Sequence, residues 1–291
     1  MFQGSIVAIV TPMLEDGAVD YDSLRGLVKF HIEAGTDAIV SVGTTGESAT
    51  LSMQEHSAVI SKTIEYAEGA IPVIAGTGAN STTEALELTE NAKKAGADAS
   101  LLVTPYYNKP TQEGLYQHFK KIAESVDIPI ILYNVPGRTS VDMTAATTAR
   151  LAQVENIIGT KEAHGTVDRI KELVALCPDD FIVLTGDDGT AMESILAGAR
   201  GNISVTANVV PALMHEMCAA ALAKDESRAR ELDEKLAELS RLLFIESSPI
   251  PAKWSLQQMG RIGAGIRLPL VPLDENFHAD VAGALKKAGA L

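Results

Sequence analysis

Short runs of hydrophobic and β-branched residues recur along the chain and alternate with segments of helical periodicity. Eight such runs begin at residues 5, 37, 71, 99, 128, 156, 181 and 202. Each run is almost continuously apolar, which is typical of parallel strands that are buried on both faces. Between them, apolar residues recur at spacings of three and four, as in the stripe formed by Leu24, Leu27, Val28 and Ile32. The pattern predicts eight βα units in succession.

Eight consecutive βα units of the α/β class predict a (β/α)8 barrel, the TIM-barrel fold. Glycines at 35, 96 and 198 follow three predicted helices and are natural stops before the next strand. An open, doubly wound sheet is the alternative, but the regular repeat and the lack of a GxGxxG segment favour the barrel. From about Pro211 onward the periodicity is helical only. We therefore expect a barrel domain over residues 1–223 and a helical C-terminal appendage over residues 224–291.

Composition and charge indicate a globular protein and argue against several classes of partner and location. Hydrophobic residues make up 46% of the 291 residues, enough for a large buried core. The net charge of −14 argues against nucleic acid or an anionic membrane as a partner, although it allows a small anionic substrate. The N-terminus has no signal-peptide pattern, and no stretch approaches the roughly 18 apolar residues of a membrane span. With only two cysteines, Cys177 and Cys218, the sequence predicts a cytoplasmic protein without disulfides.

Polar segments follow the predicted strands, at the end of a barrel where active sites are built. They read GTTGES, GTGAN, TPYYNKP, YNVPGRT, GTKEAHG, TGDDGT and SVTAN. Turn formation explains three of their residues well: Asp187, Asp188 and Asn208. It explains Lys161, Tyr133 and Arg138 poorly, because these are not favoured turn residues. These three are the first candidates for chemistry.

Lys161 ends an apolar strand, where an unpaired ammonium group is costly to bury. Burial favours loss of its proton, and a neutral amine can form an imine with a ketone. The alternative is an ion pair with the adjacent Glu162. Neighbouring strand residues point to opposite faces, which disfavours that pair. A metal-dependent aldol mechanism is also disfavoured, because the six histidines form no ligand cluster in the sequence.

Other strand-end residues could bind carboxylates or move protons. The backbone of GTTGE, with the hydroxyls of Thr44 and Thr45, could hold a small carboxylate, although such loops also occur as plain turns. Tyr133 and the two tyrosines of TPYYNKP could relay protons, one of the three serving only in packing. Arg138 could bind a second carboxylate or form a surface salt bridge.

Together these segments resemble the dihydrodipicolinate synthase family. The motifs are GSIVAIVTPM, SVGTTGESATL, IPVIAGTGAN, LLVTPYYNKPTQEGLYQHFK, ILYNVPGRT, NIIGTKEA and GNISVTANV, and the similarity runs from Gly4 to the C-terminal IRLPL. The resemblance implies condensation of pyruvate with L-aspartate 4-semialdehyde to 4-hydroxy-tetrahydrodipicolinate, the committed step of lysine and diaminopimelate synthesis. It implies an imine on the enzyme and neither a cofactor nor a metal.

The resemblance assigns catalytic roles to four residues. Lys161 would form the imine with pyruvate, and Tyr133 would pass protons during imine formation and to the aldehyde. Thr44 would bridge Tyr133 to Tyr107, which in this family comes from the neighbouring subunit. Such an exchange implies a dimer, and the family is typically a homotetramer built as a dimer of dimers.

It also assigns binding roles. Thr45 would hold the pyruvate carboxylate, Arg138 would bind the carboxylate of the semialdehyde, and Ile203 would line the site. Lysine, as feedback inhibitor, would bind at Ser48, Ala49, His56, Asn80, Glu84 and Tyr106. Three residues depart from common family patterns: Met53, where some lysine-sensitive relatives have histidine, and Thr160 and His164 beside the lysine. We expect Thr160 to point away from Lys161 and His164 to be a loop residue.

Two other functions remain open on the sequence. A pyruvate-dependent lyase for N-acetylneuraminate or a 2-keto-3-deoxy sugar acid would share the imine step. Arg138 favours the synthase, because a polyhydroxylated substrate would more often be met by small or hydroxyl-bearing side chains. A catalytically silent relative that senses a keto acid or amino acid is the third hypothesis.

Overall fold

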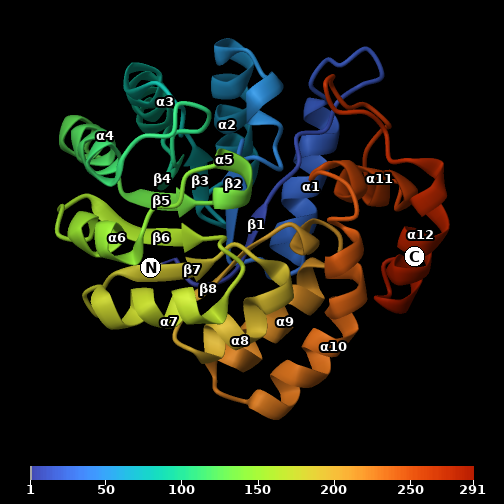
Figure 1. Ribbon diagram of the computed structural model, residues 1–291. Coiled ribbons are helices and arrows are strands. Elements are labelled where there is room, and N and C mark those ends of the chain that lie inside the picture. The colour runs from blue at the N-terminus through green and yellow to red at the C-terminus, as the bar shows by residue number, and fades with distance from the viewer. Residues whose placement is uncertain (1) are drawn as a thin grey trace.

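Eight parallel strands close into a barrel in the computed structural model, which describes residues 2–291 (Figure 1). Each strand pairs with the next along the chain, and the last pairs with the first. The strands are β1 (Gly4–Ala8), β2 (Ala38–Ser41), β3 (Val73–Gly76), β4 (Ala99–Val103), β5 (Ile130–Asn134), β6 (Ile157–Glu162), β7 (Ile182–Thr185) and β8 (Gly201–Ser204). The predicted (β/α)8 barrel is confirmed, and the open-sheet alternative is wrong.

A helix follows each strand and covers the outside of the barrel. These helices are α1 (Tyr21–Glu33), α2 (Met53–Ala67), α3 (Thr82–Ala95), α4 (Gln112–Ser125), α6 (Ala145–Leu151), α7 (Val167–Leu176), α8 (Ala191–Leu196) and α9 (Pro211–Leu222). A four-residue helix, α5 (Pro136–Thr139), is inserted after β5. The predicted stops at Gly35, Gly96 and Gly198 all have positive φ, which L-residues with side chains rarely adopt.

The core has two layers, which explains why the strands read as continuous apolar runs. One set of strand side chains fills the barrel interior, including Ile6, Val40, Ile74, Leu101, Ile131, Leu184 and Ile203. The alternate side chains pack outward against the helices, together with Leu24, Phe119, Leu173 and Met214. Both faces of each strand are thus removed from water, as in other parallel barrels.

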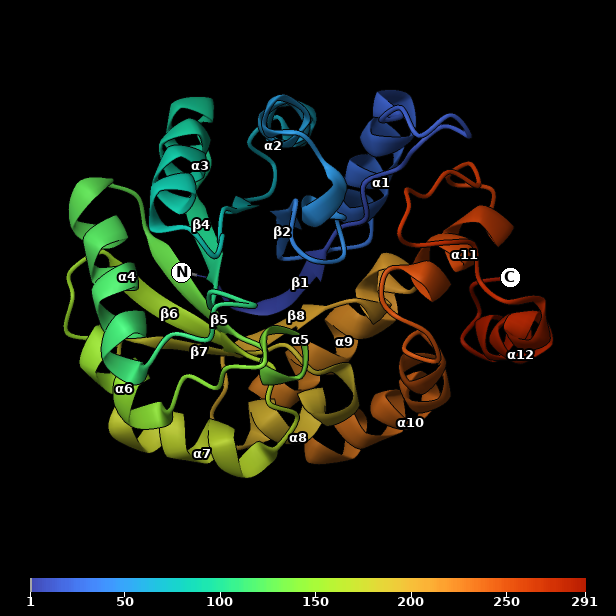
Figure 2. The same cartoon turned by 45° about the horizontal axis from the view of Figure 1, so that its top comes forward.

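Three further helices form the C-terminal appendage: α10 (Glu226–Leu242), α11 (Ile250–Gln258) and α12 (His278–Lys287). They lie together on one side of the barrel (Figure 2). α10 packs against α8, α9 and α12, while α11 packs against α12 and the turn after β8. From Pro211 onward the regular elements described are all helices, joined by irregular segments, as the sequence predicts. A domain boundary at 223/224 stays a prediction.

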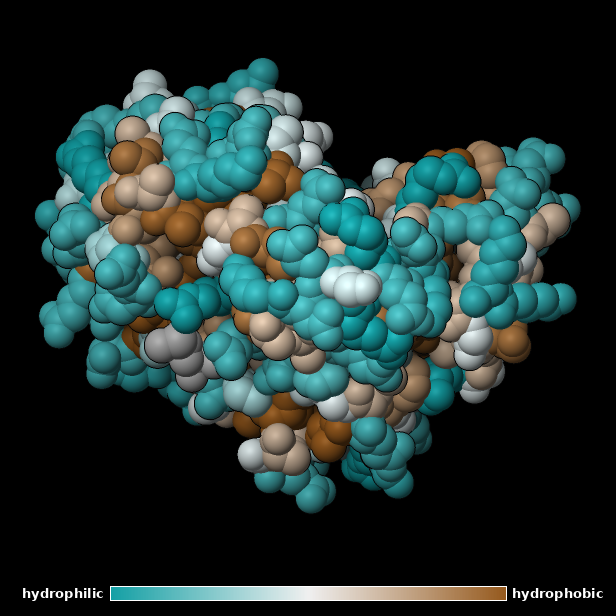
Figure 3. Space-filling view, turned by 90° about the horizontal axis from the view of Figure 1, so that it is seen from below, coloured by the Kyte–Doolittle hydropathy of each residue, from teal (hydrophilic) through white to brown (hydrophobic). Residues whose placement is uncertain are grey.

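The surface shown in Figure 3 is mostly hydrophilic, with hydrophobic side chains in separate patches. Among the described residues, no helix combines the length and the apolar character needed to cross a membrane. Both cysteines are free thiols: Cys177 is half-buried and Cys218 fully buried.

Candidate active site

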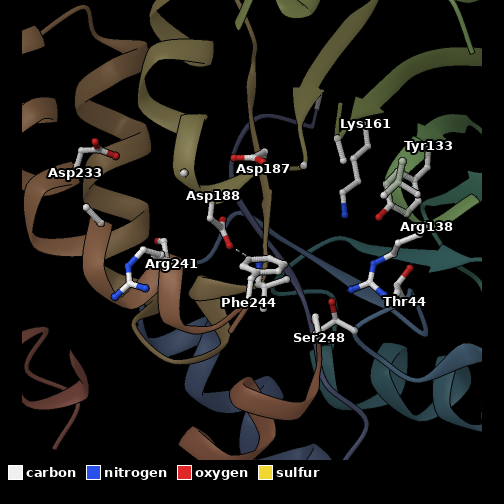
Figure 4. A pocket seen from close by; sticks show the side chains of 18 residues that line it. Thr44, Tyr133, Arg138, Lys161, Asp187, Asp188, Asp233, Arg241, Phe244 and Ser248 are labelled. Carbon is white, nitrogen blue, oxygen red and sulfur yellow. Dashed lines mark hydrogen bonds between the residues drawn. The ribbon is translucent and has the colours of Figure 1, made fainter. Parts of the chain in front are cut away.

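A cavity of about 480 Å³ lies at the C-terminal ends of the strands (Figure 4). Its walls come from the loop after β2, from the ends of β5, β6, β7 and β8, and from α10. Of the sequence candidates, the cavity brings together Thr44, Thr45, Tyr133, Arg138 and Lys161.

Lys161 points into this cavity from β6. Its side chain is only 6% exposed, and its Nζ lies 4.3 Å from the centre of the Tyr133 ring, on the paired strand β5. Within residues 2–291 the ammonium group has no ion-pair or hydrogen-bond partner. The lysine is held by packing and by an aromatic face, so its nitrogen is available to a ligand.

Glu162 faces the other way, which excludes the ion pair considered above. Its carboxylate accepts hydrogen bonds from Asn134 Nδ2 at 3.0 Å and from the His164 backbone N–H at 2.9 Å, and Arg169 lies 3.6 Å away. Burial raises the pKa of Glu162 to about 7, although the hydrogen bonds and Arg169 oppose the shift. Thr160 pairs with Leu132 and Val183, which pack outward, so it is turned away from Lys161 as expected. His164 lies in the loop after β6, as expected, and is exposed.

Gly186, at the end of β7, leaves the space through which Lys161 reaches the cavity. A Cβ atom on this residue would lie 2.5 Å from Lys161 Cε and 3.1 Å from its Cγ. No side chain fits there without displacing the lysine. Gly186, the first glycine of TGDDGT, is therefore part of the site, although nothing in its local sequence indicates such a role.

The GTTGE segment forms a tight turn beside the lysine. Val42, just before it, has φ 56°, a left-handed conformation that is costly for a β-branched residue. The turn is held by the Gly46 and Glu47 backbone N–H groups, which donate to the carbonyls of Gly43 and Thr44. Such strain is typical of segments whose position matters for a site, and this one presents Thr44 and Thr45 to the cavity.

Arg138 lies at the cavity entrance, on α5. Its side chain is exposed and, among the described residues, has no carboxylate partner, so the surface salt bridge considered for it is not formed. In Figure 4 its guanidinium group extends toward the space below Lys161, next to Thr44. A free guanidinium group in this place can accept a carboxylate with two parallel hydrogen bonds.

Three residues lie where the sequence analysis did not place them. Asp188 is no simple turn former: it is buried and accepts hydrogen bonds from Asn202, Val205 and Thr206. Asn208 is also buried, in the turn after β8, and its side chain donates to the Ala8 carbonyl and accepts from the Val10 N–H at the end of β1. Ile203 sits in the barrel interior, and Val205 lines the cavity instead. Asp187 does form the expected turn, accepting from the Thr190 N–H.

The α10 side of the cavity was also not anticipated. Asp233, Ala237 and Arg241 lie at four-residue spacing along the helix, and Phe244 and Ser248 continue this wall. Burial raises the pKa of Asp233, with Glu193 adding to the shift. These residues come from the appendage, and nothing in their local sequence indicates that they meet the barrel ends.

A second cavity of about 510 Å³ adjoins the first. Thr44, Val135, Arg138 and Ser248 line both cavities. Of the expected lysine-binding residues, the second cavity contains Ser48, Ala49, His56, Glu84 and Tyr106, together with Met53. Asn80 is not in its lining, and its backbone carbonyl accepts a hydrogen bond from Asn108.

Two side chains of this second cavity have shifted pKa values. Burial lowers the pKa of His56, which favours the neutral imidazole. Burial and the nearby Glu84 raise the pKa of the Tyr106 phenol. The cavity therefore combines the carboxyl groups of Glu47 and Glu84 and the guanidinium group of Arg138 with neutral polar side chains.

Tyr107 lies outside both cavities. Its side chain is 89% exposed, and its φ of 74° is strained for an aromatic residue. In the described chain it makes no contact with Thr44 or Tyr133 through a hydrogen bond, and none joins Thr44 to Tyr133. A single protomer thus does not assemble the three-residue relay.

The model of the dihydrodipicolinate synthetase family matches residues 1–288. The chain belongs to this family. Its family relatives include the 4-hydroxy-tetrahydrodipicolinate synthases of Pseudomonas savastanoi pv. phaseolicola and Methylococcus capsulatus. Each is 60% identical over 291 residues, covering 100% of both chains.

Solved structures of the synthase family have the same fold. A chloride-inhibited dihydrodipicolinate synthase from Acinetobacter baumannii, complexed with pyruvate, has a TM-score of 0.99 and 60% identity, covering 100% of both chains. A dihydrodipicolinate synthase from Cyanidioschyzon merolae, with lysine bound, has a TM-score of 0.96 and 36% identity, covering 100% of this chain and 99% of the other. The family resemblance expected from the sequence is confirmed.

Over residues 2–291, no three or more His, Cys, Asp or Glu side chains are grouped so that they could hold a metal ion. The groups present at the site are an amine, hydroxyls, a guanidinium group and carboxylates, which suit acid–base and imine chemistry.

Proposed function

We propose that this chain condenses pyruvate with L-aspartate 4-semialdehyde to give 4-hydroxy-tetrahydrodipicolinate. The observation that carries the proposal is the buried, unpaired Lys161 at the strand ends, beside Tyr133, with Arg138 at the entrance of the same cavity. The synthases that are 60% identical over the full chain support this activity over cleavage of N-acetylneuraminate or a sugar acid. They also argue against a silent sensor.

Lys161 begins the chemistry by adding to the keto carbon of pyruvate. Water leaves to give the imine, and loss of a methyl proton gives an enamine, whose carbon adds to the aldehyde of the second substrate. The amino group of that substrate then closes the ring and releases the lysine. Each step needs a proton moved near Lys161 Nζ, and Tyr133 is the phenol beside it.

Two binding groups orient the substrates. The turn that carries Thr44 and Thr45 offers hydroxyls and backbone N–H groups to the pyruvate carboxylate. Arg138 binds the carboxylate of the semialdehyde at the entrance. In a chain of net charge −14, this unpaired arginine gives two anionic substrates a local attraction.

The second cavity is the proposed site of feedback inhibition by L-lysine. Glu84 would pair with the ammonium group of the effector, and the likeness to the lysine-bound relative supports this assignment. Shared walls at Thr44 and Arg138 would pass its effect to the active site. Glu84→Ala should weaken inhibition at least about tenfold while sparing turnover. A dose–response assay with lysine checks this, and unchanged inhibition would remove Glu84 from the site.

The assembly proposed is a cytoplasmic homotetramer built from two dimers. Tyr107, exposed and strained in one protomer, would complete the relay in the neighbouring copy. No resident cofactor is proposed, because the imine forms on Lys161 itself.

Turnover of defined substrates tests the proposed function. The purified protein is supplied with pyruvate and L-aspartate 4-semialdehyde, and formation of the cyclic product is followed. N-acetylneuraminate and a 2-keto-3-deoxy sugar acid are the comparison substrates. Condensation with the semialdehyde, and no release of pyruvate from the sugar acids, is the expected result. The reverse pattern would contradict the proposal.

A further inference from the structure

The last residue of the GTTGE turn forms a buried ion pair with the C-terminal appendage. Lys253 Nζ, on α11, donates to Glu47 Oε2 at 2.6 Å, and the two side chains are 5% and 0% exposed. Glu47 Oε1 also accepts the Arg267 backbone N–H at 3.4 Å. The chemistry above uses neither Glu47 nor Lys253.

Stability alone is a weak reason for such a pair. Removing two charges from water costs about as much as their attraction returns, so apolar residues of similar size would often stabilise a fold as well. A buried pair does fix geometry, because either charge left without the other is strongly unfavourable. The position of Glu47 is therefore tied to that of Lys253.

Glu47 is itself part of the turn that presents Thr44 and Thr45. It has φ 57°, and its backbone N–H closes the turn on the Thr44 carbonyl at 3.0 Å. On the barrel side, Thr11 Oγ1 donates to the Gly46 carbonyl at 2.7 Å. On the appendage side, Arg267 donates to the Thr50 carbonyl at 2.8 Å. The turn is held between the barrel and the appendage.

We propose that Glu47 and Lys253 are positioning residues whose ion pair sets the place of the Thr44–Thr45 turn and thereby the affinity for pyruvate. The appendage then contributes to the active site through contacts that touch no substrate. This inference rests on the proposed function, because pyruvate is the ligand whose affinity the turn controls.

The test compares three variants of the full-length chain. Lys253→Met removes one charge, and Glu47→Gln/Lys253→Met removes both and leaves no unpaired charge. Lys287→Met is the matched control, because Lys287 also pairs with a glutamate at 2.6 Å in the appendage, with the side chains 71% and 44% exposed. The KM for pyruvate, kcat and the melting temperature are measured for each.

Lys253→Met should raise the pyruvate KM at least about tenfold, with a smaller change in kcat, and lower the melting temperature. The double variant should recover most of the melting temperature yet keep the raised KM, because the turn is still unfixed. Lys287→Met should match the wild type in all three. A double variant with a wild-type KM would overturn the inference, since the pair would then only balance charge.

Hydrogen exchange at the amides of residues 43–50, without substrate, separates this inference from the proposed function. Faster exchange in both Lys253 variants, but not in Lys287→Met, is expected. If the wild type did not turn over pyruvate, the proposed function would fail, whereas exchange would still report on the turn. Unchanged exchange in the Lys253 variants would overturn the inference. If Lys253→Met does not fold, the double variant gives the same comparison.

Discussion

The reactivity assigned to Lys161 depends on its surroundings as much as on its own chemistry. A lysine in this cavity faces an aromatic ring, has no carboxylate partner among the residues described, and passes through a space kept open by a glycine. Packing at Gly186 thus determines where the nitrogen lies. Small displacements of such a nucleophile are costly for catalysis.

Gly186→Ala should lower kcat by about 10- to 100-fold, because the new Cβ would meet Lys161 Cε. Gly189→Ala is the matched control: its Cβ would meet only Asp187 Oδ1, at an ordinary contact distance of 3.4 Å. Steady-state kinetics with thermal melts check the prediction. Equal losses in both variants would show that the whole loop, and not the lysine, is sensitive.

The sequence identifies a functional residue most readily where a side chain that is costly to bury stands in an apolar segment. Lys161 stands out in an apolar strand, and its position at the sixth strand end was predicted correctly. Asp188 and Asn208 were misjudged because they bond to residues outside their own turns: 14 to 18 residues away for Asp188 and up to 200 residues away for Asn208. Glu47 was passed over for the same reason, since Lys253 is 206 residues distant.

Successive side chains of β6 point to opposite faces of the strand and therefore lie in different environments. Lys161 faces the cavity, while Glu162 faces a polar cluster with Asn134, Arg169 and Asp142 under α7. Arg169 and Asn134 hold the pKa of Asp142 below its ordinary value despite its partial burial, whereas burial dominates at Glu162. The two carboxyl groups of one cluster therefore titrate in different pH ranges.

The raised pKa of Glu162 should make the free energy of unfolding fall as the pH rises from about 4.5 to 7. Between these pH values the folded protein keeps the Glu162 proton, whereas the unfolded chain releases it. The contribution of this proton to the free energy of unfolding is therefore complete below pH 4.5 and is lost as the pH rises through 7. Its size is on the order of 3 kcal/mol. Glu162→Gln should remove this slope in denaturant unfolding measured across the window.

Glu172→Gln is the control for this measurement. Glu172 pairs with the same arginine at 3.5 Å but is 55% exposed, so its loss should leave the pH dependence of unfolding unchanged. If Glu162→Gln kept the wild-type slope, the buried carboxyl would not be its source.

The strands and long helices were the features of the structure that the sequence predicted best. Each of the eight apolar runs corresponds to one strand. A strand that is buried on both faces needs apolar residues at nearly every position, so it is visible in the sequence as a continuous run. The short α5, which carries Arg138, was not anticipated, since four residues are too few for a periodicity. Its Pro136 at the first turn is the only local signal.

At the scale of the whole molecule, one protomer does not bring together the three residues of the proposed relay. Tyr107 is 89% exposed and, among the described residues, forms no hydrogen bond with Thr44 or Tyr133 of its own chain. The proposed dimer would supply it from the other copy. The appendage contributes in another way, through α10 at the cavity wall and α11 behind the GTTGE turn.

Complementation between two inactive variants tests the exchange of Tyr107. Tyr107→Phe and Lys161→Ala should each lose most activity as pure proteins. Co-refolded at equal amounts, they should regain activity, because mixed dimers contain one site with both Lys161 and the partner's tyrosine. The kcat per site after mixing is the measurement. No recovery, despite mixed dimers seen by native mass spectrometry, would contradict the exchange.

Reductive trapping shows whether Lys161 forms the imine with pyruvate. The protein is incubated with pyruvate, reduced with borohydride, digested and analysed by mass spectrometry. The peptide with Lys161 should gain the mass of pyruvate less one oxygen atom, and Lys161→Ala should gain none. An adduct on another lysine, or turnover of pyruvate by Lys161→Ala at the wild-type rate, would contradict this role of Lys161.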